Sequence, residues 1–214
     1  MQPPKRDGLH HTDTNREEGL SRTQLQGRTV LVIGGSAGIG LETARLARAE
    51  GAHVIITARD PDRLHRAGLE LAAGIAAFDA TDFDRLEKFF GALASPIDHV
   101  LVAGGYDGHV DGQLLLPVNV ARNAKGKVRP GGTVLFIGVT DYRRPAALSA
   151  LTKNLALELA PVRVNLIATG FVDTPSPPTD VAALALHLMT NPAISGATLD
   201  VDGFRRRASG GGLD

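Results

Sequence analysis

The sequence of 214 residues has no cysteine and no tryptophan, and it has only two tyrosines. The absence of cysteine excludes disulfide bonds and thiolate metal sites. Basic and acidic residues number 23 each, so no net charge favours nucleic acid or a membrane surface as a partner. The chain lacks an apolar run of about 18 residues and an apolar signal segment in its first 25 residues. We therefore expect a cytoplasmic protein.

The scarcity of aromatic residues leaves Ala, Val, Leu and Ile to build the core, which is typical of a parallel sheet covered by helices. Residues 1–26 are polar and show no hydrophobic periodicity, so we expect a disordered N-terminal arm. One domain is expected over 27–204, followed by a loose C-terminal tail over 205–214. No metal site is predicted.

From Arg28 onward, short apolar segments alternate with segments of helical periodicity. The expected strands are 29–33, 53–57, 74–78, 99–103, 133–137, 162–167 and 197–201. The expected helices are 39–50, 62–72, one opened by Asp82, a weaker one within 113–127, 146–159 and 180–189, with a turn at 129–132. This alternation predicts an α/β fold, a doubly wound parallel sheet (Rossmann-type) of about seven strands with helices on both faces.

A glycine-rich turn joins the first expected strand to the first expected helix. Such a turn lets the backbone approach a pyrophosphate closely, and the helix N-terminus offers it free N–H groups and a partial positive charge. At this place in the fold the turn predicts dinucleotide binding. Its residues are Gly34, Gly35, Ser36, Ala37, Gly38, Ile39 and Gly40.

Three of these glycines fit the pattern Gly-x-x-x-Gly-x-Gly, and from about Arg28 to Gly203 the chain resembles the short-chain dehydrogenase/reductase family. The segments 78–82, 98–105, 162–174 and 195–203 resemble further family motifs in the same order. The resemblance implies that Asp79 lies at the adenine and that 162–174 lies along the nicotinamide. The cofactor-binding residues that it implies are Gly34, Ser36, Ala37, Gly38, Ile39, Gly40, Arg59, Asp79, Ala80, Ala103, Gly104, Gly170, Val172 and Thr174.

The end of the second expected strand distinguishes NAD from NADP. An acidic residue there would accept hydrogen bonds from the ribose 2′-hydroxyl, whereas an arginine accommodates a 2′-phosphate. Arg59 fills the position that goes with NADP in the resembled family, and Asp60 is expected to cap the helix that begins at Pro61. We therefore predict NADP(H) as the cofactor.

The resembled family performs its chemistry with a Ser and a Tyr-x-x-x-Lys motif, whose Tyr transfers a proton while hydride moves. Neither Tyr106 nor Tyr142 has a Lys four residues later. Relative to the family's active-site helix, the Tyr position falls near Asp141 and the Lys position near Pro145. The expected Ser position falls within 137–139. The standard proton machinery is therefore missing.

Tyr142, Thr140 and Asn119 are the candidate catalytic substitutes, with Arg143 or Arg144 near enough in sequence to lower a pKa. The loops that would border the substrate are short. Three hypotheses stay open. The favoured one is an atypical NADP-dependent oxidoreductase acting on a carbonyl or alcohol; the others are an NADP(H)-binding regulatory or structural protein, and a non-redox enzyme. A homo-oligomer that pairs through the helix 146–159 is expected in addition.

Overall fold

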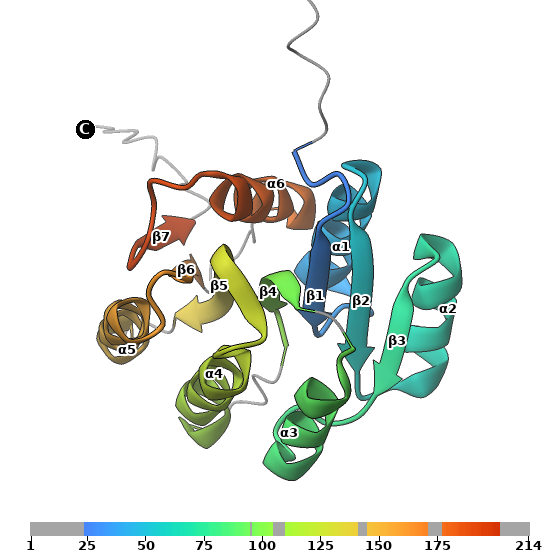
Figure 1. Cartoon of the computed structure of the whole chain (residues 1–214), viewed down its shortest axis with the longest axis horizontal. Coiled ribbons are helices and arrows are strands. Elements are labelled where there is room, and N and C mark those ends of the chain that lie inside the picture. Colours follow the sequence, from blue (N-terminus) through green and yellow to red (C-terminus); the bar gives the residue numbers. More distant parts are fainter. Residues whose placement is uncertain (1–23, 95, 105–109, 141–144, 171–176, 202–214) are drawn as a thin grey trace, which may run out of the picture.

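A single sheet of parallel strands forms the centre of the computed structural model, which describes residues 24–94, 96–104, 110–140, 145–170 and 177–201. The strand order is β3-β2-β1-β4-β5-β6-β7 (Figure 1). The strands are β1 (Thr29–Ile33), β2 (His53–Ala58), β3 (Gly74–Ala77), β4 (Ile97–Val102), β5 (Val128–Thr140), β6 (Arg163–Gly170) and β7 (Thr198–Val201). The predicted α/β doubly wound sheet is confirmed.

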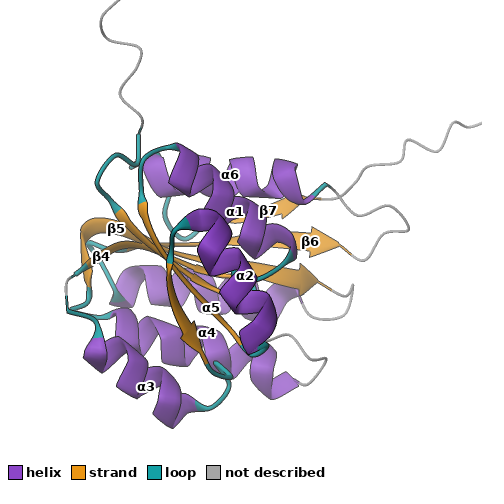
Figure 2. Cartoon of the chain, turned by 90° about the vertical axis from the view of Figure 1, so that its right-hand side faces the viewer, coloured by secondary structure: helices purple, strands orange, loops and turns teal. Residues whose placement is uncertain are grey.

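Helices cover both faces of this sheet (Figures 1 and 2). They are α1 (Gly38–Ala49), α2 (Pro61–Leu71), α3 (Phe83–Ala92), α4 (Val110–Ala124), α5 (Pro145–Glu158) and α6 (Pro178–Thr190). On one face α1, α2 and α6 pack against Val32 and Leu101, and on the other α3, α4 and α5 pack against Leu31 and Phe136. Alternate residues of each central strand thus enter opposite cores.

The strands and helices expected from the sequence are all present, with bounds that differ by a few residues. The clearest correction concerns 129–132, which was predicted as a turn and instead belongs to β5. Ile97 pairs with Val128 but His99 pairs with Thr133, so the register shifts there and the extra residues of β5 bulge. Gly131, with a φ of +79°, takes part in this irregularity. The Arg-Pro-Gly-Gly segment therefore bends a strand rather than separating two elements.

Leu25 lies before the expected start of the domain at 27, in the segment predicted as a disordered arm. Leu25 is buried, with 1% of its surface exposed, and packs in the same core as Val30 and Val54. The core therefore includes a side chain that the sequence assigned to the arm, while the tail over 205–214 lies outside the described residues. None of the helices in the described ranges has the length and apolar character needed to cross a membrane.

Candidate nucleotide-binding site

The turn after β1 is held against β2 by its own backbone. The N–H groups of Gly34 and Gly35 both donate to the carbonyl of Thr57, at 2.9 and 3.0 Å. Gly34 has a φ of +87°, and a Cβ added to it would lie 2.7 Å from the backbone nitrogen of Gly104. Only glycine meets both conditions, so the backbone of this turn lies directly against the segment that follows β4.

The N-terminus of α1 is equally close to the turn. A Cβ on Gly40 would lie 2.2 Å from the carbonyl oxygen of Gly34, which is well inside contact distance. The N-cap residue, Ala37, has no side chain that could accept a hydrogen bond from the first helical N–H groups. These N–H groups and the helix dipole are thus available to an anion, as a pyrophosphate site requires.

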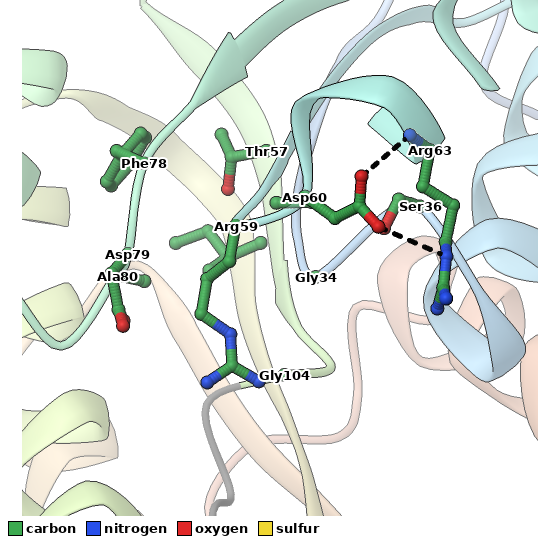
Figure 3. A pocket seen from close by; sticks show the side chains of 12 residues that line it. Gly34, Ser36, Thr57, Arg59, Asp60, Arg63, Phe78, Asp79, Ala80 and Gly104 are labelled. Carbon is green, nitrogen blue, oxygen red and sulfur yellow. Dashed lines mark hydrogen bonds and ion pairs between the residues drawn. The ribbon is translucent and has the colours of Figure 1, made fainter. Parts of the chain in front are cut away.

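A pocket opens beside this turn, where β1, β2, β3 and β4 end (Figure 3). It has a volume of about 620 Å³, counting the solvent at its mouth. The pocket lies where the strand order reverses, between the parallel strands β1 and β4, which is the usual position of a ligand in open α/β sheets. Its lining is Ile33, Gly34, Ser36, Thr57, Ala58, Arg59, Asp60, Arg63, Phe78, Asp79, Ala80 and Gly104.

Arg59 lies in the middle of this pocket, between Asp79 on one side and Asp60 on the other (Figure 3). The Arg59 side chain leaves the end of β2 and extends across the pocket toward Gly104 (Figure 3). The Asp79 carboxylate accepts hydrogen bonds from the backbone N–H and the hydroxyl of Thr81, at 2.9 and 2.7 Å. Although burial by itself raises the pKa of Asp79, these hydrogen bonds and the charge of Arg59 hold that pKa below its usual value. Asp79 is therefore fixed in its ionised form.

Asp60, which follows Arg59, is directed into α2. Its carboxylate accepts hydrogen bonds from the backbone N–H groups of Asp62 and Arg63, both at 3.0 Å, which confirms the predicted cap. Its other oxygen lies 3.5 Å from Nε of Arg63 (Figure 3). The backbone hydrogen bond from Arg63, together with the nearby positive charge, lowers the pKa of Asp60. The Asp60 carboxylate, two residues after the end of β2, is thus engaged in capping α2.

Comparison with known proteins agrees with this geometry. The sequence profile of the short chain dehydrogenase family matches residues 28–110. The short-chain dehydrogenase/reductase ATR9 of Stachybotrys chlorohalonatus is 30% identical over 187 residues, which cover 68% of this chain and 74% of that protein. The chain belongs to the short-chain dehydrogenase/reductase family. Dehydrogenase/reductase SDR family member 4 of Oryctolagus cuniculus is 31% identical over 192 residues, covering 72% of this chain and 74% of that protein.

Solved structures of the family share the fold. BdcA from E. coli has a TM-score of 0.74 at 25% identity, over 83% of this chain and all of that one. A structure of BdcA in complex with NADPH has a TM-score of 0.73 at 21% identity, over 84% of this chain and 95% of that one. The chain is thus a Rossmann-type member of a family of oxidoreductases.

Most of the predicted cofactor residues lie close together in the structure. Of the predicted cofactor residues, Gly34, Ser36, Arg59, Asp79, Ala80 and Gly104 line the one pocket. Ala37, Gly38, Ile39 and Gly40 form the start of α1 beside it, and a Cβ on Gly40 would lie 3.2 Å from that of Ala103. Gly170 ends β6, while Val172 and Thr174 lie outside the described residues.

The predicted catalytic residues are placed less completely. Thr140 is the last residue of β5 and pairs with Gly170 of β6. Asn119 lies within α4, where its side-chain amide donates to the carbonyl of Leu115 at 2.8 Å. Tyr142 lies outside the described residues, as do Tyr106, Asp141, Arg143 and Arg144. The catalytic role of each therefore stays a prediction.

Several pocket residues were not predicted from the sequence. Thr57 and Arg63 belong to this group, together with Ile33, Ala58 and Phe78. Arg63 lies four residues after Arg59, at the start of a helix that packs beside the end of β2, and this spacing could have indicated it. Thr57 contributes its backbone carbonyl, which no side-chain pattern reveals.

Proposed function

We propose that this protein is an NADP(H)-dependent oxidoreductase acting on a carbonyl or alcohol through a non-standard active site. Bound NADP(H) would supply or accept the hydride. The turn at Gly34–Gly40 and the N-terminus of α1 would hold the pyrophosphate, and Asp79 and Ala80 the adenine side. A cytoplasmic location, favoured by the absence of cysteine, belongs to the same proposal.

The observation that supports NADP(H) over NAD(H) is that Arg59 lines the pocket while the neighbouring Asp60 caps α2. Arg59 and Ser36 line the pocket, and a guanidinium and a hydroxyl are groups from which a 2′-phosphate would accept hydrogen bonds, which supports the proposal. Asp60 is engaged as the cap of α2, which leaves it poorly suited to accept from a ribose 2′-hydroxyl. The NADPH complex of the related fold BdcA is consistent with this choice.

The proton-transfer group would lie near the end of β5. Tyr142 is our first candidate because its phenol is the group with the family's own chemistry, and Thr140 and Asn119 are the alternatives. Thr140 pairs with Gly170, so the ends of β5 and β6 lie at the same edge of the sheet as the nucleotide pocket.

The deciding experiment is a calorimetric titration with NADPH and with NADH, on the wild type and on Arg59→Ala. Because a charged hydrogen bond contributes about 1.5–3 kcal/mol, we expect NADPH affinity to fall about tenfold to a hundredfold while NADH affinity changes little. Arg85→Ala, which changes an exposed arginine of α3 that does not line the pocket, is the matched control. Equal loss for both nucleotides would overturn the assignment of Arg59 to the 2′-phosphate.

A panel of small carbonyl substrates then tests turnover through the NADPH absorbance. Tyr142→Phe should abolish turnover and leave NADPH binding intact if the phenol transfers the proton. Turnover that survives in Tyr142→Phe would exclude this residue and direct the test to Thr140→Val and Asn119→Ala.

A second function, NADP(H) binding without turnover, is favoured by one observation. Pro145 fills the position of the family's Lys and is the first residue of α5, so the helix begins where the family carries its catalytic lysine. Tight NADPH binding by the wild type, with no absorbance change for any carbonyl tested, would support this regulatory or structural role.

A homo-oligomer that pairs through α5 also remains our proposal. The leucines Leu148, Leu155 and the following Leu159 are buried, so one side of this helix faces the core. Leu157 instead is 81% exposed, and Leu115 of the adjacent α4 is 44% exposed. Light scattering of the wild type and of Leu157→Ser tests whether this face associates.

A further inference from the structure

A second and larger cavity lies at the opposite end of the sheet, where the central strands begin. Its volume is about 1,780 Å³, counting the solvent at its mouth. Residues near the starts of β1, β4 and β6, the bulged start of β5 and the C-terminal end of α6 line it. The nucleotide pocket shares none of these residues, so the two sites are separate.

Three polar side chains form a row beneath this cavity. His99 of β4 pairs in register with Thr133 of β5, which pairs with Arg163 of β6, so all three project from the same face of the sheet. His99 and Arg163 line the cavity, and Thr133 lies between them. All three are more than nine-tenths buried.

Each member of this row has a buried polar atom without a hydrogen-bond partner in the described part of the chain. These atoms are Nδ1 of His99, Oγ1 of Thr133 and Nε of Arg163. Buried polar groups in folded proteins nearly always have partners. Three unpartnered atoms on adjacent strands, beside one cavity, therefore indicate a group that the described part of the chain does not supply.

The charges around the row specify what kind of group this is. The Arg163 guanidinium donates to the carbonyls of Leu188, Met189 and Asn191 at 2.6, 2.6 and 2.7 Å, but no carboxylate of the described chain pairs with it. Asp98, an acid that lines the same cavity, accepts from Arg28 and from the N–H of Thr29, both at 2.9 Å. Arg163 is thus a buried cation without a counter-ion, and such a charge favours an anion.

We propose that this amino-end cavity is a second ligand site, which takes a small oxyanion, a carboxylate or a phosphate group, against the row His99–Thr133–Arg163. Nε–H of Arg163 and the hydroxyl of Thr133 donate to the oxyanion, and the His99 ring closes the site on the β4 side. A water molecule would satisfy the polar atoms but would leave the charge of Arg163 without a counter-ion.

The test follows the ring signals of His99 by NMR in the full-length protein, titrated with inorganic phosphate or with acetate at constant pH and ionic strength. The His99 signals are assigned by comparison with His99→Gln. Because the reporter is local, anion binding at the glycine turn does not interfere. We expect a saturable shift, and the anion that produces it identifies a phosphate or a carboxylate as the ligand group.

Thr133→Val removes only the hydroxyl. Because Oγ1 has no partner in the described chain, the melting temperature should stay the same or rise, while anion affinity falls about tenfold. Thr152→Val is the matched control: this threonine is also buried, but its hydroxyl donates to Leu148 within α5. The proposal is overturned if neither anion shifts the His99 signals, or if Thr133→Val binds the anion as tightly as the wild type.

Discussion

The site at the carboxyl ends of the strands (the carboxyl edge) and the site at their amino ends (the amino edge) are built from different groups. At the carboxyl edge, the nucleotide pocket depends on backbone geometry: glycines at contact distance, a helix N-terminus and the carbonyl of Thr57. Its two carboxylates, Asp60 and Asp79, have partners within their own loops. At the amino edge, the cavity depends on polar side chains from separate strands, three of which have a polar atom without a hydrogen-bond partner in the described chain.

This difference bears on how each site tolerates change. A backbone-built site survives substitution of most side chains but fails when a glycine acquires a Cβ. A site built from side chains keeps its shape through conservative substitutions but depends on charge and protonation. The comparison predicts steric sensitivity at the carboxyl edge and pH sensitivity at the amino edge.

The largest effect is expected for Gly40→Ala. The added Cβ would overlap the carbonyl of Gly34, so the turn and the helix start must separate. We expect NADPH affinity to fall at least about a hundredfold, with a lower melting temperature, measured by calorimetry and thermal unfolding.

Gly91→Ala is the control for that substitution, because a Cβ at this position in α3 meets nothing within 4 Å. It should be neutral or slightly stabilising. Normal NADPH binding by Gly40→Ala would show that the turn does not form the site, and the contrast between the two edges would be lost.

The next effect is acid destabilisation through His99. Burial, opposed by Asp98 and reinforced by the charges of Arg163 and Arg28, lowers the pKa of His99 to about 4. The unfolded chain takes up the proton near pH 6.5, so stability falls as the pH drops from about 6.5 to about 4. The free energy of unfolding should decrease by up to about 3 kcal/mol over this pH range, which urea unfolding at each pH measures.

His99→Gln should flatten this pH dependence, whereas the exposed His53→Gln should not. The lowered pKa of Asp79 adds a loss in the same direction at still lower pH, where its carboxylate takes up a proton. An unchanged slope between pH 6.5 and 4 in His99→Gln would mean that the amino edge is not the pH-sensitive one.

The smallest effect is expected for Asp60→Ala. The change removes the acceptor of the first N–H groups of α2, so the melting temperature should fall by a few degrees. Asp60→Asn keeps an acceptor and should recover most of this loss. We also expect that neither variant binds NADH more tightly than the wild type, because Asp60 is assigned to the cap of α2 rather than to the ribose. Weaker NADH binding in Asp60→Ala would contradict that assignment.

The carboxyl edge could be predicted from the sequence because its signals are local. The glycine turn lies within seven residues, and Arg59 and Asp60 are neighbours at the end of one strand. The amino edge could not be predicted, because His99, Thr133 and Arg163 are about 30 residues apart and each resembles an ordinary strand residue. Only the register of β4, β5 and β6 brings them into one row.

The bulge in β5 also could not be predicted from the sequence, because it depends on strand pairing. The Arg-Pro-Gly-Gly segment has the composition of a turn, and tertiary pairing with β4 made it part of a strand. Leu25 was likewise hidden in a polar segment, because one buried side chain gives no periodicity.

The strand order has a consequence for how the molecule assembles. β1, β2 and β3 associate through short crossovers, as do β4 to β7, and the two groups meet where β1 pairs with β4 and α1 packs on α6. The contact between Gly34 and Gly104 lies on this junction. A nucleotide in the pocket would therefore bind only after the two halves have docked, and by mass action it would oppose their separation.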